Sequence, residues 1–290
     1  MRIAAAAYPI DWFDSMADYE AKLTAWVTEA DGADLLVFPE YGAMELASLG
    51  GRAVAGDLEA SLHEVARHWP QVQALHRRLA AAHGCHILGA SGPVFDGPRP
   101  VNRALLYGPD GIIGHQDKQI MTRFEREDWD VTGNPGLRVF DTSLGRIGVL
   151  ICYDSEFPLL GRVLAQAGVE LLLVPSCTDT VAGFNRVRIG AMARALESQC
   201  VVVQAPTVGA CDWMPALDEN RGRAAVYGPP DGFWPETGII AEGPMDRPGW
   251  VFADVDLSRV ARSRQEGAVL PHAHWPESDG IGLTRTETFS

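Results

Sequence analysis

Apolar and polar residues alternate along the chain in blocks that predict strands and helices in turn. Apolar runs at 3–8 and 35–38 have the length of buried strands, and the apolar spacing at 16–27 is that of one helix face. A longer helical pattern covers 58–83 and is broken at Pro70, a residue that helix interiors exclude. The first third of the chain therefore predicts a strand–helix–strand opening and a further helical region.

The remaining pattern continues this alternation. Strands are expected at 102–107 and 112–116, and the turn residues Pro109, Asp110 and Gly111 between them predict a hairpin. Further strands are expected at 87–90, 137–140, 146–151, 171–175, 201–205, 238–241 and 251–257, and further helices at 157–167 and 184–199. The polar segment 121–135 predicts a loop. Strands and helices in alternation indicate the α/β class.

The sequence has no Ser-rich or Pro-rich stretch that would divide it into domains. We therefore expect one compact α/β unit over 1–260, followed by a C-terminal arm over 261–290.

Composition narrows the class of partner. The 290 residues are 47% hydrophobic and 21% charged, with a formal net charge of −14. This apolar content disfavours disorder, and an acidic chain has no cluster of Lys and Arg for nucleic acid or an anionic membrane. Its apolar runs fall far short of the roughly 18 residues of a spanning helix. The start of the chain does not resemble a secretory leader, so we expect a cytoplasmic protein.

Five cysteines are scattered through the sequence, and no two of them form a C-x-x-C pair: Cys85, Cys152, Cys177, Cys200 and Cys211. An odd number at these spacings indicates neither a disulfide framework nor a structural zinc site. The question is whether one of the five carries out chemistry.

Cys152 has the most suggestive position. It follows the apolar strand 146–151 and precedes the predicted helix 157–167, which places its thiol at a sharp turn. Backbone N–H groups and a helix end at such a turn can lower a thiol pKa and stabilise an oxyanion. Position alone fits a small buried hydrophobe equally well. Cys177 follows the neighbouring strand 171–175 and is expected nearby.

Candidate partners for a reactive thiol are carboxylates and a lysine rather than histidines. Glu40 and Lys118 each follow an apolar strand, at the strand end where open α/β sheets place their sites. Either charge taken alone is typical of a solvated strand end. The i, i+2 pair His272 and His274 is typical of solvated side chains, although two such residues could contact a metal.

Together these positions match a known pattern. The segments Phe38-Pro39-Glu40-Tyr41, Asp117-Lys118-Gln119-Ile120 and Ile151-Cys152-Tyr153-Asp154-Ser155-Glu156-Phe157-Pro158 resemble the three signature segments of the nitrilase superfamily of carbon–nitrogen hydrolases, in the same order. The resemblance implies a four-layer αββα sandwich with two mixed β-sheets. It also implies a homodimer that pairs through the helices following Cys152 and Phe184.

The resemblance further implies a mechanism without a metal or an organic cofactor. Cys152 would attack an amide-like carbon to form a thioester. Glu40 would act as the general base and acid, and Lys118 with the backbone N–H of Tyr153 would stabilise the oxyanion. The lysine and the helix end would favour the thiolate.

Other residues near these segments have expected roles. Members of the superfamily often carry a second glutamate after the lysine, for which Glu125 is favoured and Glu127 is the alternative. Asp154 and Ser155 are expected to cap the helix at Phe157. Glu45 is expected to be a surface charge.

The residues after the nucleophile bear on the substrate. Tyr153-Asp154 resembles the amidase and carbamoylase branches rather than the Trp-Glu of enzymes that act on nitriles. We therefore expect hydrolysis of a small linear amide, with Trp129, Phe184 and Trp213 as candidate pocket residues. Open alternatives are an N-carbamoyl substrate, a nitrile, acyl transfer to an acceptor other than water, and a catalytically idle interaction or thiol-sensor module.

Overall fold

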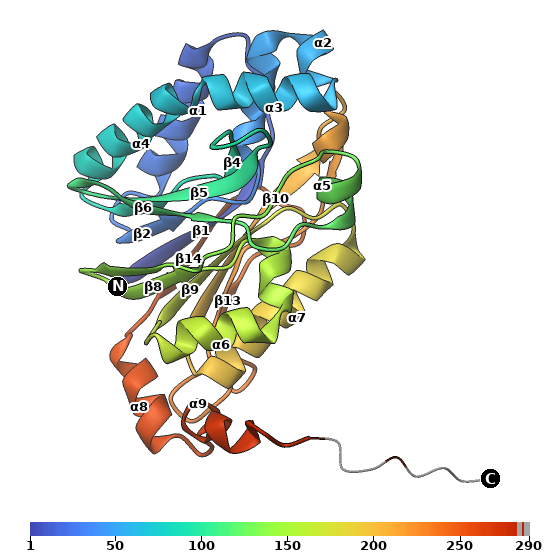
Figure 1. Ribbon diagram of the computed structural model, residues 1–290. Coiled ribbons are helices and arrows are strands. Elements are labelled where there is room, and N and C mark those ends of the chain that lie inside the picture. The colour runs from blue at the N-terminus through green and yellow to red at the C-terminus, as the bar shows by residue number, and fades with distance from the viewer. Residues whose placement is uncertain (283–285, 287–290) are drawn as a thin grey trace.

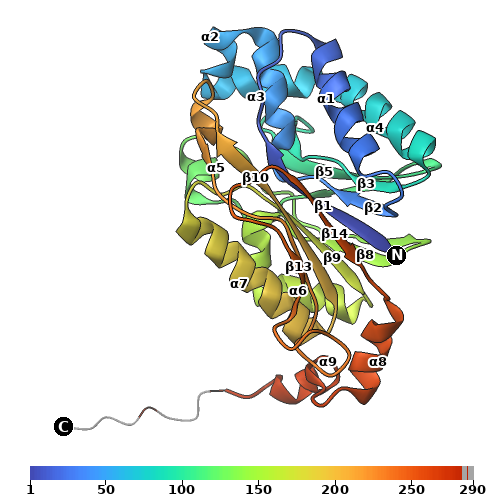
Figure 2. The same cartoon turned by 180° about the vertical axis from the view of Figure 1, so that it is seen from behind.

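Two β-sheets lie face to face at the centre of the molecule, and helices cover the outer side of each sheet (Figure 1). In this computed structural model, which describes residues 1–282 and 286, helices α1, α3 and α4 cover one sheet, and α6 and α7 cover the other (Figures 1 and 2). The expected four-layer αββα sandwich is confirmed.

The elements follow one another as the alternation predicted. The strands are β1 (Arg2–Pro9), β2 (Leu35–Val37), β3 (His86–Leu88), β4 (Gly92–Val94), β5 (Val101–Gly108), β6 (Gly111–Asp117), β7 (Val139–Thr142), β8 (Gly145–Val149), β9 (Leu171–Ser176), β10 (Val201–Ala210), β11 (Glu219–Asn220), β12 (Ala225–Tyr227), β13 (Ile239–Glu242) and β14 (Gly249–Asp254). The α-helices are α1 (Met16–Glu29), α2 (Arg52–Ala55), α3 (Leu58–Arg67), α4 (Trp69–His83), α5 (Arg123–Glu127), α6 (Pro158–Gln166), α7 (Val181–Ser198), α8 (Ser258–Glu266) and α9 (Pro271–His274). The 3-10 helices are η1 (Gly42–Gly50), η2 (Cys152–Glu156), η3 (Pro215–Leu217) and η4 (Trp275–Ser278).

Both sheets are mixed. In the first, the order β4-β5-β3-β2-β1 is extended by β14 beside β1 and by β6 beside β5. In the second, the order β7-β8-β9-β10 is extended by β12 and β13. The strands β1, β2 and β3 are parallel, as are β8, β9 and β10, whereas the hairpin strands are antiparallel.

The two sheets are joined along one strand, which the sequence pattern did not predict. One edge of β1 pairs with β14 over residues 2–7 and then with β10 at Tyr8 and Pro9. Tyr8 lies opposite Thr207, and Pro9 lies opposite Val208. Hydrogen bonding is therefore continuous from one half of the sandwich to the other.

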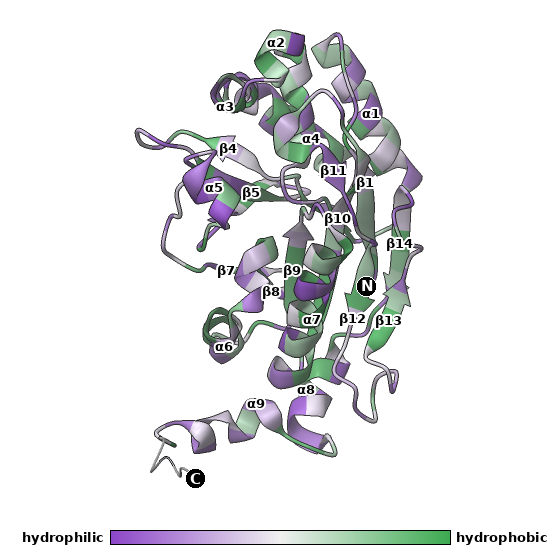
Figure 3. Cartoon of the chain, turned by 90° about the vertical axis from the view of Figure 1, so that its right-hand side faces the viewer, coloured by the Kyte–Doolittle hydropathy of each residue, from purple (hydrophilic) through white to green (hydrophobic). Residues whose placement is uncertain are grey.

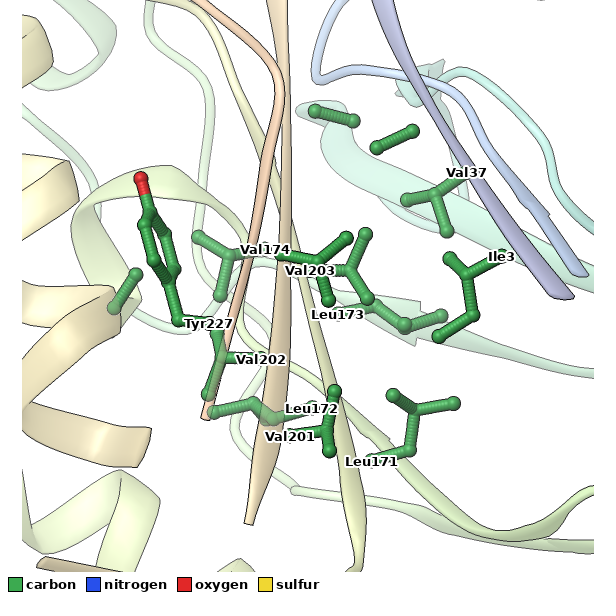
Figure 4. Close-up of a cluster of buried hydrophobic side chains, with 14 of the residues drawn as sticks. Ile3, Val37, Leu171, Leu172, Leu173, Val174, Val201, Val202, Val203 and Tyr227 are labelled. Atoms are coloured by element: carbon green, nitrogen blue, oxygen red, sulfur yellow. The ribbon is translucent and has the colours of Figure 1, made fainter. Parts of the chain in front are cut away.

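Side chains of β1 alternate between two hydrophobic clusters, because successive side chains of a strand point to opposite faces. Ile3 and its alternate neighbours belong to the cluster between the sheets, whereas Tyr8 belongs to the cluster under α1 and α4. Figure 4 shows Ile3 and Val37 facing Leu173 and Val203 across the gap between the sheets. The strands are accordingly the most hydrophobic part of the ribbon in Figure 3, whereas α5 is largely hydrophilic.

Local signals explain where the predicted elements begin, end or differ. Pro70 stands in the first turn of α4 and separates it from α3, as the pattern predicted. The prediction of a loop at 121–135 was wrong in part, because α5 forms within it. Thr122 caps that helix and Glu125 completes a capping box, a T-x-x-E signal that was present in the sequence.

The C-terminal helices pack against the second half of the sandwich. The Arg264 guanidinium on α8 donates to the carbonyls of Val169 and Ser198, and Gln199 Nε2 donates to the carbonyl of Ser263. The boundary at residue 260 stays a prediction. Within residues 1–282 and 286, no helix has the length and apolar content to cross a bilayer.

Candidate active site

Three charged or nucleophilic side chains meet where three strands end. Glu40 follows β2 through Pro39, Lys118 follows β6 directly, and Cys152 follows β8 after two apolar residues. All three side chains are almost fully buried. Lys118 Nζ donates a 2.7 Å hydrogen bond to Glu40 Oε1, so the structure brings together the residues that the three segments singled out.

The backbone at two of these strand ends is left-handed. Cys152 has a φ of 50° and Tyr41, immediately after Glu40, has a φ of 54°. Non-glycine residues enter this region rarely and at a cost in conformational energy. At Cys152 the conformation makes the sharp turn that presents the thiol, which donates a 3.5 Å hydrogen bond to the carbonyl oxygen of Cys177.

Lys118 favours the thiolate of Cys152, as expected, but other effects outweigh it. Burial, followed by the negative charge of Glu40, raises the pKa of the Cys152 thiol well above its ordinary value, although Lys118 opposes this. The helix that begins at Cys152 is the short 3-10 helix η2, and the α-helix α6 begins only at Pro158. The resting residue is therefore a thiol, and its proton must leave during the reaction.

Glu40 is placed and tuned to accept that proton. Burial raises its pKa to about 7, and the neighbouring Glu125 carboxylate adds to the increase while Lys118 reduces it. Asn102 Nδ2 donates a 3.0 Å hydrogen bond to the same Oε1 atom that Lys118 contacts. Asn102 was missed in the sequence, where it was a strand residue with no feature to distinguish it.

Of the two candidate auxiliary glutamates, the structure places Glu125 beside the lysine. Lys118 Nζ lies 2.8 Å and 2.7 Å from its two carboxylate oxygens. The Tyr41 hydroxyl and the Thr122 hydroxyl also donate to Glu125, at 2.7 Å and 2.8 Å. Glu127 is exposed and forms an ion pair with Arg123.

The charges around Lys118 keep it protonated. Burial alone would lower the pKa of the ammonium, but Glu125 and Glu40 outweigh burial and raise that pKa well above its usual value. In turn, Lys118 holds the pKa of Glu125 below its usual value despite burial. The cluster therefore favours a charged Lys118 and a charged Glu125, and Glu40 is the carboxylate whose pKa is raised.

The expected capping role of Asp154 and Ser155 was wrong. Phe157 is the N-cap residue of α6 and has no side-chain cap. The Asp154 carboxylate accepts hydrogen bonds from the backbone N–H groups of Gln119 and Ile120, whereas Ser155 Oγ donates to the carbonyl of Cys152. Burial raises the pKa of Asp154 to about 6.

Glu45 was wrongly expected on the surface. Its side chain is fully buried on η1, where it accepts hydrogen bonds from the Tyr8 hydroxyl at 2.7 Å and from Lys22 Nζ at 2.7 Å. Lys22 also pairs with Asp11. This network fastens η1, which follows Glu40 and Tyr41, to β1 and α1.

A cavity of about 610 Å³ opens above the buried cluster. Four residues expected at or near the site are among those that line it: Cys152, Tyr153, Cys177 and Trp129. Phe184 and Trp213 are not among the described residues that line it. Phe184 is buried beneath Gly222, and Trp213 packs edge-on against Trp12.

Metal ligation has no obvious place in the described part of the chain. In residues 1–282 and 286, no group of three or more His, Cys, Asp or Glu side chains is arranged to hold a metal ion. His272 packs against the end of α6, with its Nε2 atom 3.3 Å from the carbonyl oxygen of Ala165.

The sequence has relatives along most of its length. The probable hydrolase YhcX of Bacillus subtilis is 31% identical over 272 residues, which cover 93% of this chain and 52% of that protein. The chain thus spans about half the length of that relative. The human omega-amidase NIT2 is 26% identical over 274 residues, which cover 86% of this chain and 87% of that protein.

Solved structures share the fold. Saccharomyces cerevisiae Nit3, a member of branch 10 of the nitrilase superfamily, superposes with a TM-score of 0.70 at 21% identity, covering 91% of this chain and 93% of that chain. A carbon–nitrogen hydrolase from Helicobacter pylori gives a TM-score of 0.74 at 16% identity, covering 97% and 94%. Residues 2–265 match the family model for carbon–nitrogen hydrolases. The chain therefore belongs to the carbon–nitrogen hydrolase family.

Proposed function

We propose that the protein hydrolyses the C–N bond of a small linear amide, giving a carboxylate and ammonia or an amine. One observation carries the proposal: the buried Glu40 carboxylate accepts a hydrogen bond from the Lys118 ammonium and lines the same cavity floor as the Cys152 thiol, whose pKa its charge raises. A nucleophile, a base and a fixed positive charge are the groups that acyl transfer through a thioester needs.

In the acylation step, Glu40 takes the proton from Cys152 as the sulfur attacks the amide carbon. The ammonium of Lys118 and the backbone N–H of Tyr153 stabilise the negative charge that develops on the carbonyl oxygen. The C–N bond then breaks, and Glu40 returns the proton to the departing nitrogen. The products of this half-reaction are a thioester on Cys152 and ammonia or an amine.

In the deacylation step, Glu40 takes a proton from water, which attacks the thioester carbon. The C–S bond breaks, and the sulfur recovers the proton from Glu40. The raised pKa of Glu40, about 7, supports this role because the group must bind and release a proton in each half-reaction. Glu125 stays ionised and holds Lys118 in place through two short contacts.

The names of relatives support the amide as substrate. The human relative is an omega-amidase, and an amidase from Nesterenkonia shares the fold with a TM-score of 0.63. The same proposal includes a cytoplasmic location, which the five unpaired cysteines of the described structure support because reducing compartments preserve thiols.

The proposal also includes a homodimer. Helices α6 and α7 form the outer layer of the second sheet and present exposed apolar side chains: Leu159, Val163, Ile189 and Leu196, which are 74%, 52%, 66% and 47% exposed. Exposed apolar side chains gathered on two neighbouring helices are typical of an interface between protein chains.

The test is intact-protein mass spectrometry with a panel of short aliphatic, ω-amido and N-carbamoyl compounds. We expect an acyl adduct that Cys152→Ala removes and that Cys85→Ala, a change at a buried cysteine away from the cavity, retains. Glu40→Gln should block turnover while the circular dichroism spectrum stays unchanged. If no compound in the panel forms an adduct or a carboxylate product, the proposed function is wrong.

A further inference from the structure

The charges that line the cavity are unbalanced. Six carboxylates and three cationic side chains line it: Glu40, Glu125, Glu156, Asp179, Asp218 and Glu219 against Lys118, Arg123 and Arg186. Lys118 is committed to Glu40 and Glu125 on the floor. The charge that a substrate meets on entry is therefore set at the rim.

Both rim arginines already have a carboxylate partner. Arg123 on α5 forms an ion pair with Glu127, whose oxygens accept hydrogen bonds at 2.9 Å and 2.8 Å. Arg186 on α7 lies 3.5 Å from Glu156, which is in η2 beside the nucleophile. These helices lie close together at one edge of the sandwich (Figure 1). Glu127 and Glu156 therefore offset part of the positive charge that these two exposed arginines bring to the rim.

Three further rim carboxylates form no ion pair within residues 1–282 and 286. Asp179 follows β9, whereas Asp218 follows η3 and Glu219 begins β11, so they come from two different segments around the opening. In the described part of the chain, no Lys, Arg or His nitrogen lies within 4.0 Å of the Asp179, Asp218 or Glu219 carboxylate. The rim thus carries an excess of negative charge.

Aromatic surface accompanies these carboxylates. Phe124 is 36% exposed beside Arg123, and Tyr153 is half-buried beside Cys152; both line the cavity. The faces of aromatic rings attract alkylammonium groups, particularly where the cation has lost part of its water. The ring faces and the carboxylates are independent features, and both favour a cation over an anion.

We propose that the amide substrate carries a positive charge, as a protonated amine or a guanidinium, at the end remote from the scissile bond. This inference rests on the proposed function and names its substrate class: an ω-amino or ω-guanidino amide. Hydrolysis adds one water across the C–N bond and gives an amino acid with the charged group intact, together with ammonia. A cleft lined by charges of one sign concentrates ligands of opposite charge and repels ligands of like charge.

The test compares three primary amides of equal chain length that end in an ammonium, a methyl or a carboxylate group. We expect kcat/KM to be about tenfold or more higher for the ammonium amide than for the carboxylate amide, with the methyl amide between them. The preference should shrink as ionic strength rises from about 0.01 to about 1 M, where the screening length falls from about 30 to about 3 Å.

Variants locate the effect at the rim. Replacing Asp218 and Glu219 together by Asn and Gln should lower the ammonium-to-methyl ratio of kcat/KM by about two- to fivefold, the range for partly solvated charge pairs. Glu236→Gln removes the same kind of charge from an exposed position outside the cavity and should leave the ratio unchanged.

The outcomes separate this inference from the proposed function. Turnover of the methyl amide with no preference for the ammonium amide, or with a preference for the carboxylate amide, overturns the inference and leaves the hydrolase proposal standing. A preference for the ammonium amide that the rim variants do not reduce also overturns the inference, because residues other than these carboxylates would then recognise the charge. Absence of turnover for all three amides overturns both.

Discussion

The Asp154 carboxylate accepts a 2.9 Å hydrogen bond from the backbone N–H of Ile120. Asp154 lies two residues after Cys152, and Ile120 lies two residues after Lys118. A hydrogen bond to a fully buried carboxylate therefore ties the nucleophile turn of one sheet to the lysine strand end of the other. The distance between sulfur and ammonium depends on this contact as well as on the direct charges.

Asp154→Ala should disturb this arrangement. The change leaves two backbone N–H groups without their acceptor, so we expect the free energy of unfolding to fall by about 1–3 kcal/mol. We also expect kcat to fall more than KM rises, because the fault lies in the position of the reacting groups. Chemical denaturation and steady-state kinetics check both, and Asp154→Asn, which keeps one acceptor oxygen, should recover part of kcat. If Asp154→Ala and the exposed control Asp141→Ala lose equal amounts of stability and of kcat, the Asp154 contact does not position the reacting groups.

The pH dependence of activity should report Glu40. Its carboxyl must be ionised to accept the thiol proton, and its pKa is raised to about 7. Because the protonated form is inactive, kcat/KM should decrease as pH falls through about 7. Asp154, whose pKa is raised to about 6, is the competing explanation. The fall of kcat/KM at acid pH should persist in Asp154→Asn. If the fall has its midpoint near the ordinary pKa of a glutamate, or disappears in this variant, Glu40 is not the group that titrates.

Glu125 and Glu127 form a natural pair of matched substitutions. Glu125→Gln removes the charge that fixes Lys118, and we expect kcat to fall by about 10²-fold or more. Glu127→Gln changes an exposed ion pair two residues away and should keep kcat within about twofold. Initial rates at saturating amide decide between them, and the reverse order would show that the auxiliary glutamate has been misplaced.

Strand ends were the part of the site that the sequence could predict. Glu40, Lys118 and Cys152 each follow a recognisable apolar run, so their convergence at one region of an α/β fold was foreseeable. Asn102 and Tyr41 contribute through contacts to residues 62 and 84 positions away, and those contacts depend on sheet packing. No local pattern contains that information.

The errors have the same physical origin. Glu45 was expected to be a surface charge, yet it is buried and Lys22 reaches it from α1. The thiol of Cys152 was expected to ionise easily because helix ends stabilise anions, whereas complete burial proved the larger effect. Local sequence patterns predicted most helices and strands. The position of Glu45 and the pKa of Cys152 depend instead on burial by residues distant in sequence.

His76 should make the fold sensitive to acid. Burial between Phe38 and Tyr107 lowers its pKa to about 4 from 6.5. Below pH 6.5 the His76 imidazole binds a proton in the unfolded chain but not in the folded chain. The free energy of unfolding therefore decreases as pH falls from 6.5 towards 4. The total effect is about 3 kcal/mol. Urea unfolding at a series of pH values should show a shallower dependence for His76→Leu, and identical slopes in both proteins would disprove this contribution.

The apolar face of α6 and α7 should determine the oligomeric state. Ile189→Glu places a charge in the proposed dimer interface, and we expect it to convert a dimer to a monomer in sedimentation velocity. Val269→Glu is a control, because Val269 is equally exposed at 66% but lies beyond α8. A native protein that sediments as a monomer would exclude the dimer.

The double pairing of β1 has a consequence for synthesis on the ribosome. As the chain emerges, β1 can pair with β2 after fewer than 40 residues, but its other edge waits for β10 and then for β14, which ends at Asp254. Until then a long apolar strand keeps an open edge, which is a template for pairing with other chains. Premature termination ahead of β14 should therefore yield insoluble fragments rather than a working half-molecule.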